Sequence, residues 1–218
     1  MTSFPNSPRL TKGGIVLIDS DSAAVKSVIA LQYNPESISR TLKVQAMGEG
    51  GDRSQAMRLK GPPVETIKLD AEIDATDQLE FPGQNPNAVA YGILPQLAAL
   101  ETILYPESGV LRANNALASA GTLEIAPMQA PLSLFIWSAN RIMLMRITDL
   151  SITEEAFDPS LNPIRAKVSL GLQVLSIDDL GFANKGGGLF MSYLQAKEQL
   201  ARKVPSAAMS AFGVGSLP

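Results

Sequence analysis

The chain has 218 residues and a formal net charge of −3, and it contains no cysteine and no histidine. This charge argues against a dedicated nucleic-acid-binding protein, because neutralising phosphates takes clustered lysine and arginine. The missing residue types exclude disulfides, thiol nucleophiles, Cys/His zinc sites and Ser-His-Asp triads. They also remove the commonest general acid and base near neutral pH, so the chain is predicted not to be an enzyme.

Charged residues make up 18% of the chain, below the roughly one quarter of an average globular protein. Either the protein buries much of its exterior against neighbours, or it is a monomer whose surface is rich in Ser, Asn and Thr. Residues 1–8 lack the apolar segment of a secretory signal, and no run reaches the roughly 18 apolar residues of a membrane helix. We therefore expect no signal peptide and no direct membrane insertion.

The first third of the chain predicts an arm, two short strands and a long hairpin. Residues 1–13 are the arm, and residues 15–18 and 28–33 are apolar runs typical of strands. The hairpin covers residues 39–64 and is expected to lie against a neighbouring subunit. Its outgoing strand, tip and return strand are marked in turn by Leu42 and Val44, by Gly48, Gly50 and Gly51, and by Met57 and Leu59.

Residues 65–73 give a clear strand signal, because apolar and charged residues alternate with a period of two. A helical segment follows, with Asn85 as a candidate cap and Pro86 at its first position. Pro95 does not fit a helix interior, so either the helix kinks there or a new helix starts near Leu94. Residues 106–130 are rich in small residues and are predicted to be a surface loop.

Residues 132–176 predict three adjacent strands joined by short turns, which is an antiparallel meander. A tight turn is expected at Ser138-Ala139-Asn140. The second strand, residues 141–153, changes its apolar phase between Ile147 and Leu150, and such a change indicates a β-bulge. Trp137 and the Met143/Met145 pair are interpreted as core. The predicted fold class is mainly β.

The character of the sequence changes after Ser176. Gly186-Gly187-Gly188 is interpreted as a hinge, and residues 205–218 as a small-residue tail. Between them, an apolar stripe at helical spacing predicts a helix that either binds a partner or folds back on its own domain; it consists of Leu189, Tyr193, Ala196 and Leu200. The expected domains are residues 1–176, a β domain, and residues 177–218, a C-terminal extension.

Few residues suggest chemistry. Asp19-Ser20-Asp21 has the form of a metal or sugar-nucleotide motif, but these residue types more often form a solvated turn. Gly48-Glu49-Gly50-Gly51 lacks the helix and the Lys-Ser/Thr pair of a phosphate loop. Glu154, Glu155 and Asp158 could serve glycoside hydrolysis, although a charged rim at a turn explains them as well. Arg146 is either buried against a carboxylate or faces a neighbouring subunit. We expect no metal and no cofactor.

Three motifs, in order, resemble those of one family. The first is Tyr33-Asn34-Pro35 after a strand, and the second runs from Pro131 to Trp137. The third contains Phe157, Pro163, Arg165 and Ala166 and leads into the alternating strand that ends at residue 176. Together they resemble the tube-type proteins of contractile injection systems, and their order and spacing are similar to those of the baseplate hub adaptor or tube-initiator members. The resemblance covers residues 12–176.

This resemblance implies a tail-tube-like β-barrel or sandwich with one flanking helix and a structural role without catalysis. It implies a homo-oligomer, a sixfold ring at the baseplate, whose partners are the inner tube protein, the spike or hub protein and other baseplate subunits. Such a particle assembles in the bacterial cytoplasm and is then released or docked at a membrane. Longer members carry a C-terminal LysM module that is missing here, and Asn162 and Ser138 stand where glycine is common in the motifs.

Two other functions stay open at this stage. The first is a β-sandwich module that binds a carbohydrate or another ligand, which would need aromatic platforms or a polar pocket. The second is a hydrolase that uses Glu154, Glu155 or Asp158. For the ring subunit, we expect contacts between subunits at the hairpin and the C-terminal helix, through Gly48, Gly50, Gly51, Met57, Leu59, Leu189, Tyr193 and Leu200.

Overall fold

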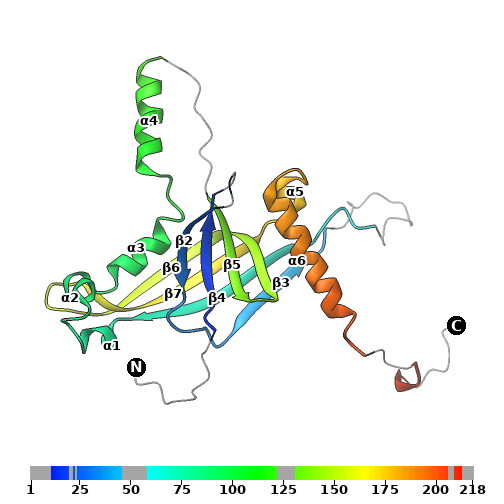
Figure 1. Ribbon diagram of the computed structural model, residues 1–218, viewed down its shortest axis with the longest axis horizontal. Coiled ribbons are helices and arrows are strands. Elements are labelled where there is room, and N and C mark those ends of the chain that lie inside the picture. The colour runs from blue at the N-terminus through cyan, green and yellow to red at the C-terminus, as the bar shows by residue number, and fades with distance from the viewer. Residues whose placement is uncertain are drawn as a thin grey trace.

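The computed structural model describes residues 11–19, 22, 24–45, 58–121, 131–205 and 209–212. Within them, seven strands form one antiparallel sheet in the order β2-β1-β5-β6-β7-β4-β3 (Figure 1). The mainly-β prediction is confirmed. The strands are β1 (Gly14–Ile18), β2 (Val25–Ala30), β3 (Ile38–Lys43), β4 (Val64–Asp74), β5 (Leu132–Ser138), β6 (Arg141–Phe157) and β7 (Pro163–Val174).

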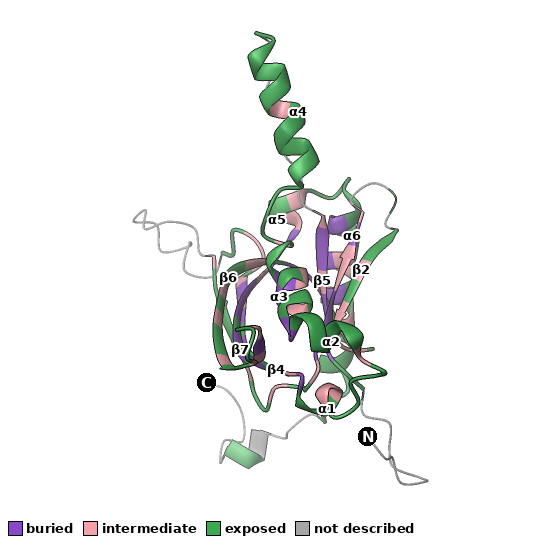
Figure 2. Ribbon diagram, turned by 90° about the vertical axis from the view of Figure 1, so that its left-hand side faces the viewer, coloured by how far each residue is buried: buried purple, intermediate pink, exposed green. Residues whose placement is uncertain are grey.

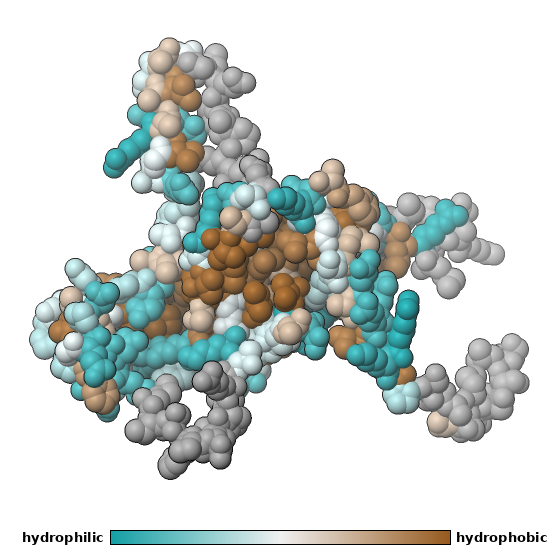
Figure 3. All heavy atoms as spheres, viewed as in Figure 1, coloured by the Kyte–Doolittle hydropathy of each residue, from teal (hydrophilic) through white to brown (hydrophobic). Residues whose placement is uncertain are grey.

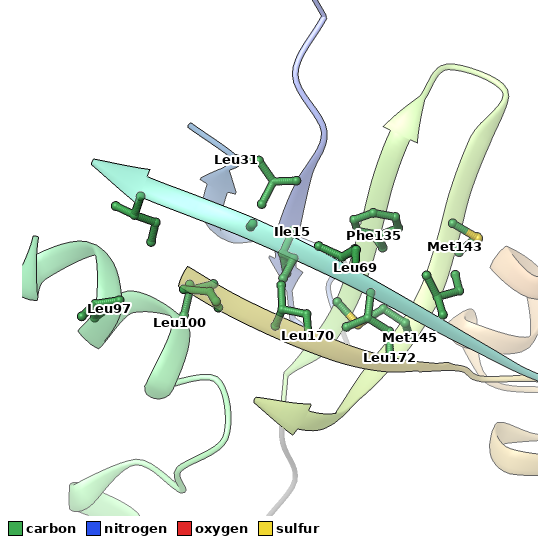
Figure 4. Close-up of a cluster of buried hydrophobic side chains, with 14 of the residues drawn as sticks. Ile15, Leu31, Leu69, Leu97, Leu100, Phe135, Met143, Met145, Leu170 and Leu172 are labelled. Carbon is green, nitrogen blue, oxygen red and sulfur yellow. The ribbon is translucent and has the colours of Figure 1, made fainter. Parts of the chain in front are cut away.

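The core lies inside the curl of this sheet (Figure 2). Alternate residues of β4 and β7 point inward, as their sequence period predicts; the buried ones are Ile67, Leu69, Ala71 and Ile73 with Ala166, Val168, Leu170, Leu172 and Val174. Ile15 of β1, Phe135 of β5 and Met143 and Met145 of β6 complete the cluster (Figure 4). Burying each large apolar side chain stabilises the fold by about 1.5–3 kcal/mol.

The predicted meander is present as β5, β6 and β7. Ala139 and Asn140 form the turn between β5 and β6. The register between β6 and β7 shifts between Ile147 and Asp149, so the β-bulge predicted from the phase change is confirmed. Gly171 faces the bulge, and an added Cβ there would lie 2.8 Å from a carboxylate oxygen of Asp149.

The resemblance implied one flanking helix, but the described residues contain six α-helices and one 3-10 helix. A new helix begins at Leu94, which places Pro95 in a first turn, where its missing N–H is harmless. The helices are α1 (Thr76–Leu79), α2 (Pro86–Tyr91), α3 (Leu94–Glu101), α4 (Ser108–Ser119), α5 (Ile177–Leu180), α6 (Lys185–Ala201) and η1 (Met209–Phe212). In the described part of the chain, none is long and apolar enough to cross a bilayer.

Two expectations about irregular segments are wrong. Within the predicted loop at residues 106–130, residues 108–119 form α4, because their alanines and leucines favour a helix more than the small-residue content suggested. The glycines predicted as a hinge lie in the first turn of α6. Gly187 is buried there, and an added Cβ would collide with the carbonyl oxygen of Gly181. Gly186 and Gly187 therefore allow close packing at the start of α6, whereas an added Cβ on Gly188 would meet open space.

Helices α3 and α6 both cover the core. Leu97 and Leu100 of α3 are buried against it, and so are Phe190 and Tyr193 of α6. The apolar stripe of the C-terminal helix was expected either to bind a partner or to fold back on its own domain. The contact of Tyr193 with the core corresponds to folding back. The boundary between the two expected domains stays a prediction.

Candidate interaction surfaces

The sheet has two open edges. Within the described residues, β2 and β3 end the strand order, so each has an outer side without a strand partner. Exposed apolar side chains lie on or beside these edges: Val25 and Val28 on β2 are 63% and 65% exposed, and Val44 after β3 is 63% exposed. Open edges with apolar side chains are ready sites for pairing with another chain.

The gap between β2 and β4 is bridged at one end by a side chain. The Gln32 amide accepts a hydrogen bond from the Asp74 backbone N–H at 2.9 Å and donates one to the Asp74 carbonyl at 2.5 Å. This paired geometry imitates one rung of a β-ladder. Gln32 therefore holds the segment after β2 to the end of β4 without a strand between them.

Beside this bridge lies a groove of about 410 Å³ between β2, β4 and α3. We call it the α3 groove and define it by Val28, Ile73, Pro95, Gln96 and Ala99. No aromatic side chain is among the described residues that line it. Figure 3 shows apolar side chains gathered over β2 and the adjoining sheet, next to α3. The Gln96 Oε1 is buried and has no hydrogen-bond partner in the described structure.

A buried carboxylate fastens α6 to the sheet. The side chain of Glu65 on β4 is 5% exposed and accepts hydrogen bonds from Arg40 Nε at 2.9 Å and Lys197 Nζ at 2.8 Å. It also accepts one from the Tyr193 hydroxyl at 3.0 Å. The Lys197 ammonium lies 4.1 Å from the centre of the Tyr193 ring. One carboxylate thus joins an edge strand, its neighbour and α6.

The charges of this cluster shift its pKa values. Burial raises the pKa of Glu65, but the hydrogen bond and charge of Lys197 and the charge of Arg40 outweigh burial and hold it below the ordinary 4.5. Burial and the neighbouring Glu65 carboxylate raise the pKa of the Tyr193 hydroxyl, which stays protonated as a donor. The sequence analysis did not single out Glu65. Its odd number places it on the same face of β4 as the buried residues, and this could have identified it.

Residues of the first two motifs hold backbone and core. Asn34 accepts a hydrogen bond from the Gly13 N–H at 2.9 Å and donates one to the Thr11 carbonyl at 2.8 Å, which fixes the start of β1. Tyr33 is 41% exposed, and Pro35 is half-buried beside it. Pro131 precedes β5, and Trp137 stacks on Phe135 with ring centres 6.1 Å apart.

The third motif forms the β6–β7 turn. Asp158 accepts hydrogen bonds from the Ser160 and Asn162 N–H groups at 2.7 and 2.8 Å. The side-chain and backbone hydrogen bonds of Asn162 lower the pKa of Asp158. The Pro163 carbonyl accepts the Ile93 N–H at 2.9 Å, which joins this turn to α3.

The remaining motif residues differ in exposure. Phe157 is 50% exposed, whereas Ala166 is fully buried. Arg165 pairs with Asp74 at 2.7 Å. The motif thus supplies turn geometry, core and one ion pair.

The structure scatters the predicted contact residues. Gly48, Gly50, Gly51 and Met57 lie outside the described residues. Leu59 is 70% and Leu200 is 45% exposed, so both are available at the surface. Leu189 packs against the small cluster of Ile18, Leu132 and Leu144, and Tyr193 is buried within its own chain. Contact between subunits through Leu59, Leu189 and Leu200 stays a prediction, whereas Tyr193 serves the α6 attachment.

The residues considered for catalysis or metal binding do not form a common site in the described structure. Glu155 pairs with Lys167 at 2.9 Å, Glu154 is exposed, and Asp158 holds its own turn. Arg146 is exposed and donates to Gln173 at 2.8 Å, so it is not buried against a carboxylate. The described residues contain no group of three acidic side chains that could hold a metal ion. Ser20 and Asp21 lie outside the described residues.

Comparisons with known proteins give little. No protein-family model matches the chain, and no curated protein is significantly similar to it. Among solved structures, the chain is similar to one described as "Tail of empty GTA particle computed with helical refinement, C6 symmetry". The sequence identity is 14% and the TM-score 0.28, and the match covers 75% of this chain and 90% of that chain. A match at this TM-score does not define a shared fold.

Proposed function

We propose that the protein is a non-enzymatic structural subunit of a phage-tail-like contractile injection particle, in which it forms a baseplate ring between the spike-bearing hub and the inner tube. The observation that carries the proposal is the sheet itself, whose edge strands β2 and β3 are both open in the described structure. The three motifs that resemble tube-type proteins support the same role.

Open edges and exposed apolar side chains favour association with further copies. An isolated sheet that leaves Val25, Val28 and Val44 exposed is prone to uncontrolled pairing. The two edges differ in sequence, so a contact between them is head-to-tail, and head-to-tail contacts form rings when the rotation closes. In this proposal six copies close the ring, and the inner tube and hub proteins bind its two faces.

The motif residues support a structural role because each one positions backbone or core. Asn34 fixes the start of β1, Pro163 joins the β6–β7 turn to α3, and Arg165 pairs with Asp74. In this proposal Glu154, Glu155 and Asp158 act as surface ion pairs and turn groups. Assembly then takes place in the cytoplasm of the producing cell, before the particle is released or docked.

Electron microscopy and native mass spectrometry of the purified protein test the ring directly. We expect closed rings of one copy number, alone or with the tube protein. A protein that stays monomeric in the presence of both tube and hub proteins would refute the proposal. In the producing cell, deletion of the gene should abolish sheathed particles; intact particles without this subunit would exclude a required ring role. A Glu154→Gln/Glu155→Gln/Asp158→Asn variant should assemble normally if these residues have no catalytic task.

A further inference from the structure

Within the described residues, helix α4 packs against no other helix or strand. Of its residues Asn114 alone is half-buried, and the others are exposed. Figures 1 and 2 show it projecting from the body beyond α3. Such an isolated helix of 12 residues is marginal in water, so its stability requires a surface to pack on.

One face of α4 is suited to packing. Residues spaced by three, four and seven positions form a stripe that is apolar except for Asn114, and the other polar residues lie on the opposite face. Val110, Leu111 and Leu117 in the stripe are 39%, 47% and 44% exposed. We call this face the α4 stripe; it consists of Val110, Leu111, Asn114, Leu117 and Ala118.

The α3 groove has the complementary character. It is lined mainly by apolar side chains, and its volume of about 410 Å³ suits a few inserted side chains of a helix. Three amide side chains also line it, Gln32, Gln78 and Gln96, and the Oε1 of Gln96 has no hydrogen-bond partner in the described structure. The α4 stripe has one amide, Asn114, at its centre. Paired amides in a mainly apolar contact fix the register, as a single buried asparagine does in coiled coils.

We propose that the α4 stripe of one copy docks in the α3 groove of a second copy. Each chain carries both surfaces once and at different places, so the contact is head-to-tail and one kind of subunit satisfies both. This inference rests on the proposed ring function and adds the elements through which neighbouring copies recognise each other. It also explains why α4 is an amphipathic helix that the described part of its own chain leaves uncovered.

Disulfide trapping tests the contact cleanly, because the chain has no cysteine. Leu117→Cys lies in the α4 stripe and Ala99→Cys in the α3 groove. Mixed single-cysteine proteins, oxidised together, should form a disulfide between the two variants, and the double variant should form a ladder of linked copies. Ser119→Cys, on the polar face of α4, replaces Leu117→Cys as the matched control and should not link to Ala99→Cys.

The outcomes separate this inference from the proposed function. A monomeric disulfide in the double variant would show that α4 covers its own groove, and exclusive Leu117→Cys self-dimers would show an α4–α4 contact; either overturns the inference. If the wild type forms rings but Leu117→Cys and Ala99→Cys form no disulfide with each other, the inference is overturned and the proposed function still stands. If the wild type forms no rings and the cysteine variants form no link, both are overturned.

A charge substitution gives an independent test. Leu117→Asp should weaken association of copies by about 10- to 100-fold, because it removes a large apolar contact and buries a charge. Asn115→Asp, on the polar face, should leave association unchanged. Both variants should melt as the wild type does, since neither residue is buried in its own chain. If Leu117→Asp subunits associate into rings as tightly as the wild type, the contact is refuted. It is also refuted if the substitution weakens binding only to a different partner protein and not between copies.

Discussion

Neutralising Glu65 is the sharpest perturbation of this fold. In a Glu65→Gln variant, Arg40 and Lys197 lose their shared counter-ion while their side chains remain only 29% and 34% exposed. Removing one partner of a fully buried pair costs about 3–5 kcal/mol, and of an exposed pair less than about 1 kcal/mol. Because the carboxylate is buried and the cations are partly solvated, we expect an intermediate loss of about 2–3 kcal/mol.

Urea denaturation followed by the fluorescence of Trp137, the only tryptophan, measures this loss. The melting temperature should fall by about 5–10 °C in parallel. Glu155→Gln is the matched control, because Glu155 pairs with an exposed Lys167 side chain; it should cost less than about 1 kcal/mol. A Glu65→Gln variant as stable as Glu155→Gln would refute the reasoning that the Glu65 cluster fastens α6.

The pH dependence of the same pair of proteins checks the mechanism. The folded-state pKa of Glu65 lies below its ordinary value of 4.5, so its stabilising contribution is complete above 4.5 and is lost as the pH falls through the folded-state value. The difference in unfolding free energy between wild type and Glu65→Gln should therefore be constant near neutral pH and shrink in acid. A difference that grows as the pH falls would contradict the assignment.

Three further changes have defined outcomes. Gln32→Leu removes both hydrogen bonds to the Asp74 backbone and should cost about 1–3 kcal/mol in urea denaturation; a neutral result would show that the bridge is dispensable. Gly92→Ala should lower the melting temperature by several degrees, because Gly92 has a φ of +56° and an added Cβ would collide with the Pro163 carbonyl; an unchanged melting temperature would contradict this. Replacing residues 107–120 by a Gly-Ser linker should leave the melting temperature of the body unchanged and abolish association between copies, and a destabilised body would show that α4 supports its own chain.

The strands could be predicted because their signals are local. The alternation along β4 and β7 fixes which residues face the core, and the phase change near Ile147 marks the bulge before any partner strand is known. Pro95 likewise leaves only two possibilities, a kinked helix or a new helix that starts near Leu94. These features depend on residues close in sequence, where period and proline chemistry decide the outcome.

The remaining features depend on contacts distant in sequence. Glu65 and Lys197 are 132 positions apart, and only the packing of α6 on the sheet brings them together. The three glycines at the start of α6 are typical of a flexible segment, yet two of them serve packing: Gly186 lies against Leu180 and Leu144, and Gly187 against the Gly181 carbonyl. Nothing in the local pattern separates a glycine needed for packing from one needed for motion.

The two long helices outside the sheet are attached in opposite ways, and this contrast bears on assembly. Helix α6 is held by buried Phe190 and by the ionic contacts of Glu65, so its position relative to the sheet is defined within one chain. Helix α4 has no fully buried residue in the described structure, so the described part of its own chain does little to fix its position. In the proposed ring both arrangements have a use: the rigid body sets the angle between neighbours, and α4 forms the contact only when a second copy presents its α3 groove.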